Sequence, residues 1–183
     1  MSFSINEFRS ALTGGGARPS LFQVSITNPV DAAADLKVPF MAKASSIPSS
    51  TTGMISVPYF GRKIKLAGDR NFDEPWTITV INDEDFLVRN AMESWMNAIN
   101  THEGNLIEFG TASPAEYKSQ AQVFQYSKDG GVLREYTFDG LFPTEISNID
   151  LNWETTDTVS EFTVTFQYDY WRVSGGRTGT STS

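Results

Sequence analysis

The order of apolar and polar residues in the first part of the chain predicts a helix followed by strands. A capping-box spacing between Ser4 and Glu7, with apolar residues behind it at helical spacing, predicts a short helix that ends at glycines 14–16. Residues 22–26 then alternate between apolar and polar, as in a strand with one buried face. Residues 30–36 follow a proline and predict a loop.

Residues 37–66 predict a long β-hairpin that projects from the body. Residues 37–44 are expected to form a strand at an edge or a bulge, because Pro39 lacks the donor that an inner strand needs. Residues 45–53 are polar and rich in turn formers, and residues 54–66 return as an extended segment. A lone hairpin is marginally stable in water, so this one is expected to need a partner surface.

Residues 61–83 contain patterns that predict strands and a turn, and no catalytic pattern. Residues 62–66 form a basic alternating strand, and residues 68–70 are expected to turn the chain back. Residues 76–81 alternate again and predict a strand that enters the main sheet. The stretch is therefore interpreted as structural.

A helix is predicted directly after this strand. Asn82 and Asp83 are favourable N-cap residues, and Glu84 and Asp85 would complement the positive end of the helix dipole. The helix is expected to end near residues 100–104. Its apolar stripe comprises Leu87, Val88, Ala91, Met92, Trp95 and Ile99.

The C-terminal half is dominated by strand periodicity. A turn or a single turn of helix is expected at residues 114–117, and residues 129–131 (Asp-Gly-Gly) predict a hairpin turn, since glycine permits positive φ. The small, polar residues after Trp171 predict a mobile or assembly-related end. Strands are predicted at residues 121–126, 132–138, 145–153 and 162–170.

Composition favours a mainly β (α+β) fold over a helical bundle. The 183 residues suffice for one domain, expected at residues 1–172 with a flexible extension at residues 173–183. Only 39% of residues are hydrophobic but 13% are aromatic, which suits sheets with large half-buried faces. The chain has no cysteine, which excludes disulfides and thiolate metal sites.

Net charge limits the range of partners. The formal charge of −8, from 22 acidic and 14 basic residues, argues against tight phosphate binding, which needs clustered cations. The N-terminus lacks the basic and apolar regions of a signal peptide, and no apolar stretch is long enough to span a bilayer. A soluble protein without a membrane partner or Sec export is expected.

Three groups of residues were weighed for chemistry and none is assigned. His102 is the only histidine, so it cannot belong to a histidine cluster. Residues 83–85 are three successive acids, which suit helix capping better than a cation site. Asp69, Asp73 and Glu74 could pair as catalytic carboxylates, but salt bridges to nearby arginines are favoured. No catalytic, cofactor-binding or metal-ligating residue is predicted.

Two surface groups suggest binding instead. A sugar-binding platform would use aromatic residues on a β-sandwich, but core and subunit interfaces use them more often. The cations Arg62, Lys63 and Lys65 are interpreted as partners for acids on another copy of the protein. The aromatic residues considered for the sugar-binding platform are Tyr59, Phe60, Trp76, Trp153, Tyr168, Tyr170 and Trp171.

The order of these landmarks resembles the tail tube protein family of T4-type contractile bacteriophages. The resemblance extends from about Phe3 to Trp171 and is densest between residues 62 and 84. It departs from the family pattern at residues 30–36, at Pro75 and in the extension from residue 173. The segments that carry it are residues 17–24, 43–48, 62–64, 67–70, 72–73, 76–80, 82–84, 114–118, 140–144, 162–165 and 169–171.

The resemblance implies an antiparallel β-sandwich or barrel-like subunit with a flanking helix. It also implies a virion tail protein assembled in the host cytoplasm. Six copies would form a ring with one continuous β-barrel, and rings would stack into a hollow tube through which double-stranded DNA passes without specific binding. Implied partners are the tail sheath, baseplate, tail terminator and tape measure proteins. The alternatives are the inner tube of a phage-derived injection particle without a genome, and a carbohydrate-binding β-sandwich.

The resemblance also assigns a role to the hairpin, about residues 45–66, which would contact the neighbouring ring. Candidate contacts between subunits or rings are Tyr59, Phe60, Arg62, Lys63, Lys65, Asp69 and Arg70.

Overall fold

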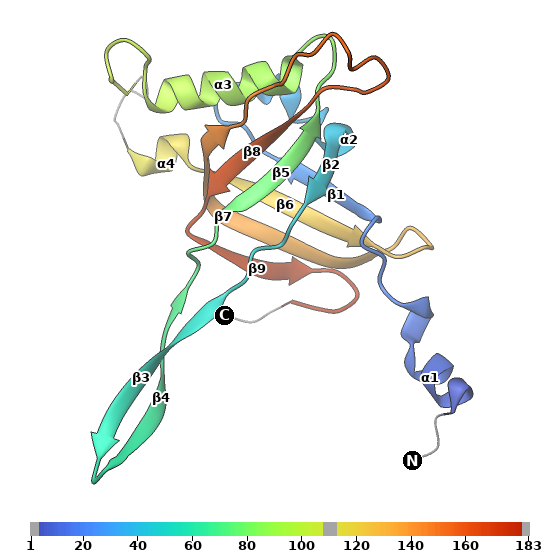
Figure 1. Ribbon diagram of the computed structural model, residues 1–183, viewed down its shortest axis with the longest axis vertical. Coiled ribbons are helices and arrows are strands. Elements are labelled where there is room, and N and C mark those ends of the chain that lie inside the picture. Colours follow the sequence, from blue (N-terminus) through green and yellow to red (C-terminus); the bar gives the residue numbers. More distant parts are fainter. Residues whose placement is uncertain (1–3, 108–112, 181–183) are drawn as a thin grey trace.

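The computed structural model describes residues 4–107 and 113–180, which form a β-sandwich with two projections (Figure 1). The helices are α1 (Ile5–Ala11), α2 (Val38–Met41), α3 (Leu87–Ile99) and α4 (Pro114–Tyr117), with single 3-10 turns η1 (Thr13–Gly15) and η2 (Ala32–Ala34). The strands are β1 (Phe22–Ile26), β2 (Ala42–Ser45), β3 (Thr51–Tyr59), β4 (Arg62–Asn71), β5 (Trp76–Ile81), β6 (Ser119–Tyr126), β7 (Val132–Ile146), β8 (Glu161–Gln167) and β9 (Tyr170–Gly175).

Strand β7 belongs to both layers of the sandwich. Its first half pairs with β6 and β9, and its second half pairs with β8, all antiparallel. One layer is therefore β1-β6-β7-β9 and the other is β7-β8-β5-β2. The predicted mainly β, antiparallel fold is confirmed.

Aromatic side chains fill the space between the layers. Trp76 of β5 stacks on Phe138 of β7 with ring centroids 4.5 Å apart, and both are fully buried. Their alternation with polar residues along each strand directs them inward. The Trp76 indole donates to Ser45 Oγ over 3.0 Å, which satisfies its buried N–H.

Helix α3 closes one end of the sandwich. Its inner stripe, including Ala91, Met92 and Trp95, is buried as the periodicity predicts. Trp95 packs near Phe166 and donates its indole N–H to the Tyr117 carbonyl over 2.9 Å. The helix is thereby fixed to both β8 and α4.

Strands β3 and β4 form a separate two-stranded sheet that leaves the body (Figure 1). The projecting hairpin predicted from the sequence exists, but its strands differ from the prediction. The chain reverses at Phe60 and Gly61, and residues 68–70 lie inside β4 instead of forming a turn. The strand pairing shifts register between Thr52, which lies opposite Arg70, and Met54, which lies opposite Ala67. Residues 68 and 69 lie within this irregular part of the ladder.

Several local predictions are confirmed. Ser4 is the N-cap of α1 as expected, because Ser4 Oγ accepts from the Glu7 N–H. Strands β1 and β5 and the single helical turn α4 have the expected positions. Gly130 has φ of 81° in the turn between β6 and β7, where the Ser127 N–H donates to the Gly131 carbonyl.

Other predictions are wrong. Residues 38–41 are helical instead of extended, because Pro39 is accepted in the first turn of α2. Residues 147–160 form no strand, although residues 145–153 were predicted to be one. The strand predicted at residues 162–170 breaks at Tyr168 and Asp169, after which β9 pairs with the other layer.

Asn82 and Asp83 do not act as the N-cap of α3 as predicted. The helix begins at Leu87, behind Phe86 in a left-handed conformation with φ of 51°. Asp85 Oδ1 accepts from the Leu87 N–H at 3.0 Å, so one of the predicted acids does bind the helix start. Asp83 and Asp85 also bind the Lys37 ammonium, at 2.7 and 2.5 Å. Hydrogen bonds from Lys37 lower the pKa of both carboxyls, and the same bonds raise the pKa of Lys37. This cluster fastens α2 to the start of α3.

The end of the described chain is held against the turn between β6 and β7. Strand β9 extends to Gly175, past the expected boundary at residue 172, and Val173 is buried. Arg177 then forms an ion pair with Asp129 at 3.0 Å, and the Thr178 N–H donates to the Leu133 carbonyl. Residues 181–183 of the predicted extension lie outside the described residues.

A search of the described residues for a membrane span finds no helix that is both long and apolar enough.

We expect Asp129→Asn to lower the urea midpoint for unfolding at neutral pH. Hydrogen bonds from Ser127, Arg177 and the Gly131 N–H lower the pKa of Asp129 from 3.8 to about 2. A depressed folded-state pKa contributes stability above the unfolded-state pKa, and this is lost as pH falls through the folded-state value. The difference between wild type and variant should therefore be complete above pH ~4 and shrink toward pH ~2. A difference that does not change with pH would contradict this assignment.

Candidate assembly surfaces

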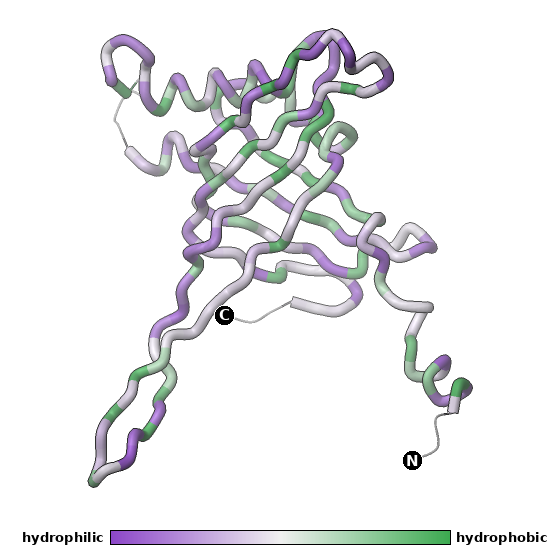
Figure 2. The backbone as a smooth tube through the Cα atoms, in the orientation of Figure 1, coloured by the Kyte–Doolittle hydropathy of each residue, from purple (hydrophilic) through white to green (hydrophobic). Residues whose placement is uncertain are grey.

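The two faces of the β3–β4 hairpin differ in chemistry. Directly paired residues share a face, so Ile55 lies with Leu66 and Val57 lies with Ile64 on one side. All four side chains are largely exposed. The opposite face pairs Ser56 with Lys65 and Pro58 with Lys63. The hairpin thus has an apolar face and a basic face, and no layer of the described structure covers either (Figure 2).

Two glycines allow the hairpin to twist at its base. A Cβ on Gly68 would lie 3.0 Å from the Gly53 carbonyl carbon, and a Cβ on Gly53 would lie 3.3 Å from the Asp69 oxygen. The two backbones therefore approach more closely than side chains would permit. A side chain at either position would therefore force the two strands apart at the base of the hairpin.

The hairpin tip carries an aromatic residue in a strained conformation. Phe60 and Gly61 have φ of 42° and 79°, the signs of a type I′ turn, which usually contains asparagine or glycine. Phenylalanine is rarely left-handed, at a cost on the order of 1 kcal/mol. Phe60 is 91% exposed, and its ring contacts the Tyr59 ring edge-on with the two ring centroids 4.7 Å apart. Burial within the subunit therefore does not offset the cost of the strained backbone.

The candidate contact residues fall into two groups along the hairpin. Tyr59, Phe60, Arg62 and Lys63 lie at the tip, with Tyr59 directly opposite Arg62, and Lys65 is two residues further along β4. Asp69 and Arg70 lie near the base. Within the described residues, Arg62, Lys63, Lys65 and Arg70 form no ion pair, whereas Lys37, Lys43, Arg89, Lys118, Arg172 and Arg177 do.

Helix α1 carries a second exposed apolar surface. The sequence pattern predicted its apolar stripe but not that the stripe is exposed. Ile5, Phe8 and Leu12 form the predicted stripe, yet all three are exposed because the helix lies away from the sandwich (Figure 1). A short isolated helix is marginal in water. The α1 stripe therefore indicates a surface that another molecule covers.

The loop of residues 147–160, between β7 and β8, is a third such surface. Leu151, Trp153 and Val159 are exposed, Trp153 completely. The same loop carries Asp150 and Glu154, together with Asp157, and contains no basic residue. Apolar side chains on an acidic loop are typical of a binding segment.

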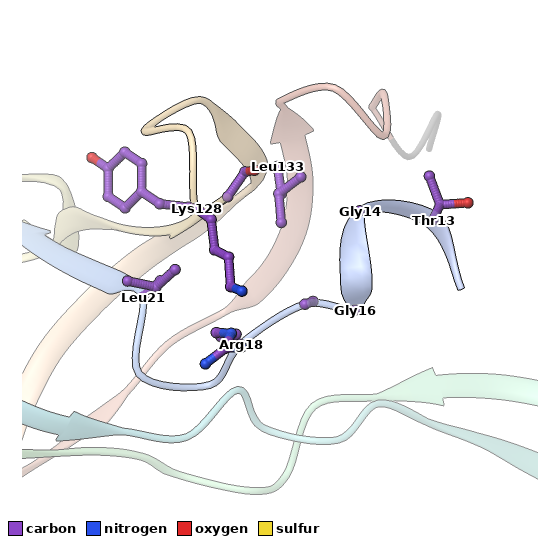
Figure 3. Close-up of a pocket in the computed structure, with 10 residues that line it drawn as sticks. Thr13, Gly14, Gly16, Arg18, Leu21, Lys128 and Leu133 are labelled. Atoms are coloured by element: carbon purple, nitrogen blue, oxygen red, sulfur yellow. The ribbon is translucent and has the colours of Figure 1, made fainter. Parts of the chain in front are cut away.

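A small hollow lies between η1 and the turn from β6 to β7 (Figure 3). Its cavity of about 60 Å³ is lined by Thr13, Leu21 and Leu133 among others. Figure 3 shows the side chains of Arg18 and Lys128 directed toward each other there, and no acid lines the hollow. Ligand pockets usually enclose ~300 Å³ or more, so this one is too small for a substrate.

The residues weighed for chemistry do not form a site. His102 lies with Glu93 and Asn97 beside a shallow surface depression on α3. Glu74 accepts from the Ser49 N–H and hydroxyl, both at 2.7 Å, instead of forming the predicted arginine salt bridge. These hydrogen bonds lower the pKa of Glu74. Among the described residues, no group of three potential metal ligands comes together.

The aromatic residues considered as a sugar platform are dispersed. Trp76 and Tyr168 are buried in the core, where burial raises the pKa of the Tyr168 hydroxyl to about 12. Tyr59 and Phe60 are at the hairpin tip, while Trp153 is in the loop at the other end of the sandwich. They do not share one face of the subunit.

Comparison with known proteins gives a consistent result. Residues 17–174 match the family described as phage tail tube protein. The chain is 38% identical over 164 residues to tail tube protein gp19 of Enterobacteria phage T4, which covers 89% of this chain and 95% of that protein.

Solved structures share the fold at lower identity. The tube-terminating cap of the anti-feeding prophage superposes with a TM-score of 0.63 at 17% identity, covering 86% of this chain and 90% of that one. The sheath–tube complex of the extracellular contractile injection system PVC contains a chain with a TM-score of 0.57 at 15% identity, covering 94% of this chain and 99% of that one. The family match and the phage T4 relative together show that this chain belongs to the phage tail tube protein family.

Proposed function

We propose that this protein is the repeating subunit of a contractile phage tail tube, in which hexameric rings stack into a hollow conduit for double-stranded DNA. The observation that carries the stacking is the uncovered apolar face of the β3–β4 hairpin. A two-stranded sheet of this kind lacks the support that a third strand or a helix would give. A neighbouring ring would supply that support.

The apolar face gives this contact an energetic basis. Ile55, Val57, Ile64 and Leu66 would each contribute on the order of 1 kcal/mol when their exposed area is covered. Phe60 would add a large aromatic surface at the tip. Arg62, Lys63, Lys65 and Arg70 would orient the contact through charge, and Asp69 would contribute from the base.

The free strand edges support ring closure. Within the described residues, β1 and β9 each pair with one strand of their layer, so each has an unpaired edge. Unpaired edges favour association with another strand. Joined edge to edge among six copies, such layers would form the continuous barrel that encloses the channel.

The acidic character of the chain supports passage of DNA without binding. With a formal charge of −8, the assembled wall would repel phosphate and leave the duplex free to slide. Outside and at the ends of the tube, the proposed partners are the tail sheath, the baseplate, the tail terminator and the tape measure protein. The subunits would assemble in the host cytoplasm and reside in the virion tail.

A genome-free injection particle is the nearest alternative use of the same subunit. The anti-feeding prophage and contractile injection system structures share the fold at 12 to 17% identity, whereas the phage T4 protein is 38% identical. Sequence similarity of this extent favours the phage tail.

Removing the hairpin should leave a folded subunit that cannot form tubes. Residues 54–67 can be replaced by Asn-Gly, because Gly53 and Gly68 already lie against each other. Circular dichroism should show the wild-type β signal, while negative-stain microscopy should show no long tubes. The same Asn-Gly replacement at residues 102–103, in the exposed turn after α3, serves as the matched control and should leave tubes intact. Long tubes from the hairpin variant would refute the proposal.

Substituting the strained tip separates subunit stability from assembly. Phe60→Gly should keep or raise the melting temperature, because glycine adopts positive φ without strain. Tube length should fall, because the exposed aromatic contact is lost. Phe60→Tyr retains the ring and should assemble like wild type. Tubes of normal length from Phe60→Gly would show that the tip makes no contact.

A further inference from the structure

The projecting hairpin and the loop of residues 147–160 lie at opposite ends of the subunit (Figure 1). Strand pairing enforces this arrangement. The hairpin ends just before β5 begins, and the loop ends just before β8 begins. Because β5 and β8 pair antiparallel, with Trp76 opposite Phe166 and Ile81 opposite Glu161, their starting points are at opposite ends of the layer.

The hairpin end of the subunit is basic. The hairpin and the N-terminal arm, residues 51–71 and 4–21, carry six basic and two acidic side chains. The described residues supply no acid partner for the four hairpin cations, as noted above. Their charge is therefore available to another molecule.

The opposite end of the subunit is acidic. Residues 82–107 and 147–160 carry eight acidic side chains and one basic side chain, Arg89, which pairs with Glu93 at 2.7 Å. Asp83 and Asp85 are occupied by Lys37. The three acids of the 147–160 loop form no ion pair within the part of the chain that the structure describes.

The 147–160 loop also presents a fixed apolar surface. Its base is tied to β8, because the Ser147 N–H donates to the Thr163 carbonyl at 2.8 Å and the Ser147 hydroxyl accepts from the Thr163 N–H at 2.9 Å. Arg89 adds a bond to the Ser147 carbonyl. Beyond this base, Leu151 and Trp153 are almost completely exposed. The loop thus offers an apolar surface that can cover the apolar face of the hairpin. It also offers negative charge to pair with the hairpin cations.

We propose that the hairpin of one copy docks on the 147–160 loop of the next copy along the tube. This inference rests on the proposed function and adds the identity of the receiving surface. The apolar hairpin face, which also carries Arg62, would cover Leu151 and Trp153. Lys63 and Lys65 lie on the opposite face of the two-stranded sheet and would attract the loop acids over a longer distance, within a screening length of about 10 Å. Two like ends repel while unlike ends attract, so the pairing also gives the stack a single head-to-tail direction.

Charge reversal with compensation tests this pairing. The double variant Lys63→Glu, Lys65→Glu and the triple variant Asp150→Lys, Glu154→Lys, Asp157→Lys should each raise the protein concentration needed for tube growth about tenfold or more. One chain carrying both sets should recover tube growth. Circular dichroism confirms folding of each variant. Replacing His102 and Glu103, at the same end but outside the loop, with Lys serves as the control and should have little effect.

Cysteine pairing provides a second readout that does not depend on growth. The natural chain has no cysteine, so an introduced pair can be followed without background. Single variants Val57→Cys or Ile64→Cys, on the apolar hairpin face, mixed with Asn152→Cys or Glu154→Cys and oxidised as tubes, should yield disulfide-linked dimers in at least one combination. Unassembled subunits and mixtures with Asn97→Cys on α3 should yield none.

The outcomes separate this inference from the proposed function. If the hairpin reversal blocks growth but the loop reversal does not, the hairpin docks elsewhere and only the inference falls. If loop reversal spares tubes but abolishes capture of the tail sheath, the loop belongs to the sheath interface and the inference also falls. If the wild-type protein forms neither rings nor tubes, the proposed function itself fails.

Discussion

The bend in β7 is the feature on which the rest of the subunit depends. Gly140, with φ of 70°, lies between the half that pairs with β6 and β9 and the half that pairs with β8. A Cβ at this position would lie 2.1 Å from the Asp169 carboxylate, which Lys118 holds at 2.6 Å. Because the strand changes layer here, Phe138 and Trp76 meet across the core. Any side chain at Gly140 would disturb both the backbone and this carboxylate.

The sequence predicted the elements whose side chains alternate between clear turn signals, such as β1, β5 and the turn at residues 129–131. It could not predict features that depend on pairing partners. Residues 145–153 alternate well enough for a strand, but only Glu145 and Ile146 belong to one, at the end of β7, whose pairing with β8 ends at Ile146 opposite Val164. The break at Asp169 similarly exists because β9 pairs with the other layer. Local propensity contains no information about which edges are free.

The candidate surfaces show the same limit. The cations Lys63 and Lys65 were recognisable from composition, but their position behind an apolar face depends on the register that the Phe60–Gly61 turn sets. The stripe of α1 was predicted correctly as a helix face, yet periodicity does not tell whether a face is covered by the same chain or by another. The exposure of Trp153 likewise required the fold, since aromatic content alone favoured a core residue.

Two departures from the usual rules of folding lie in the segments proposed to meet other molecules. The body has departures of its own in the left-handed Phe86 and in the buried Trp171 indole N–H, which has no hydrogen-bond partner within the described residues. In the body, Trp76 and Trp95 satisfy their indole donors, and the buried stripe of α3 matches its period. At the hairpin and the 147–160 loop, an aromatic residue occupies positive φ and a tryptophan is fully exposed. Neither feature stabilises an isolated subunit. Since natural sequences break local rules chiefly where function requires it, these segments are explained by contacts that only an assembly can supply.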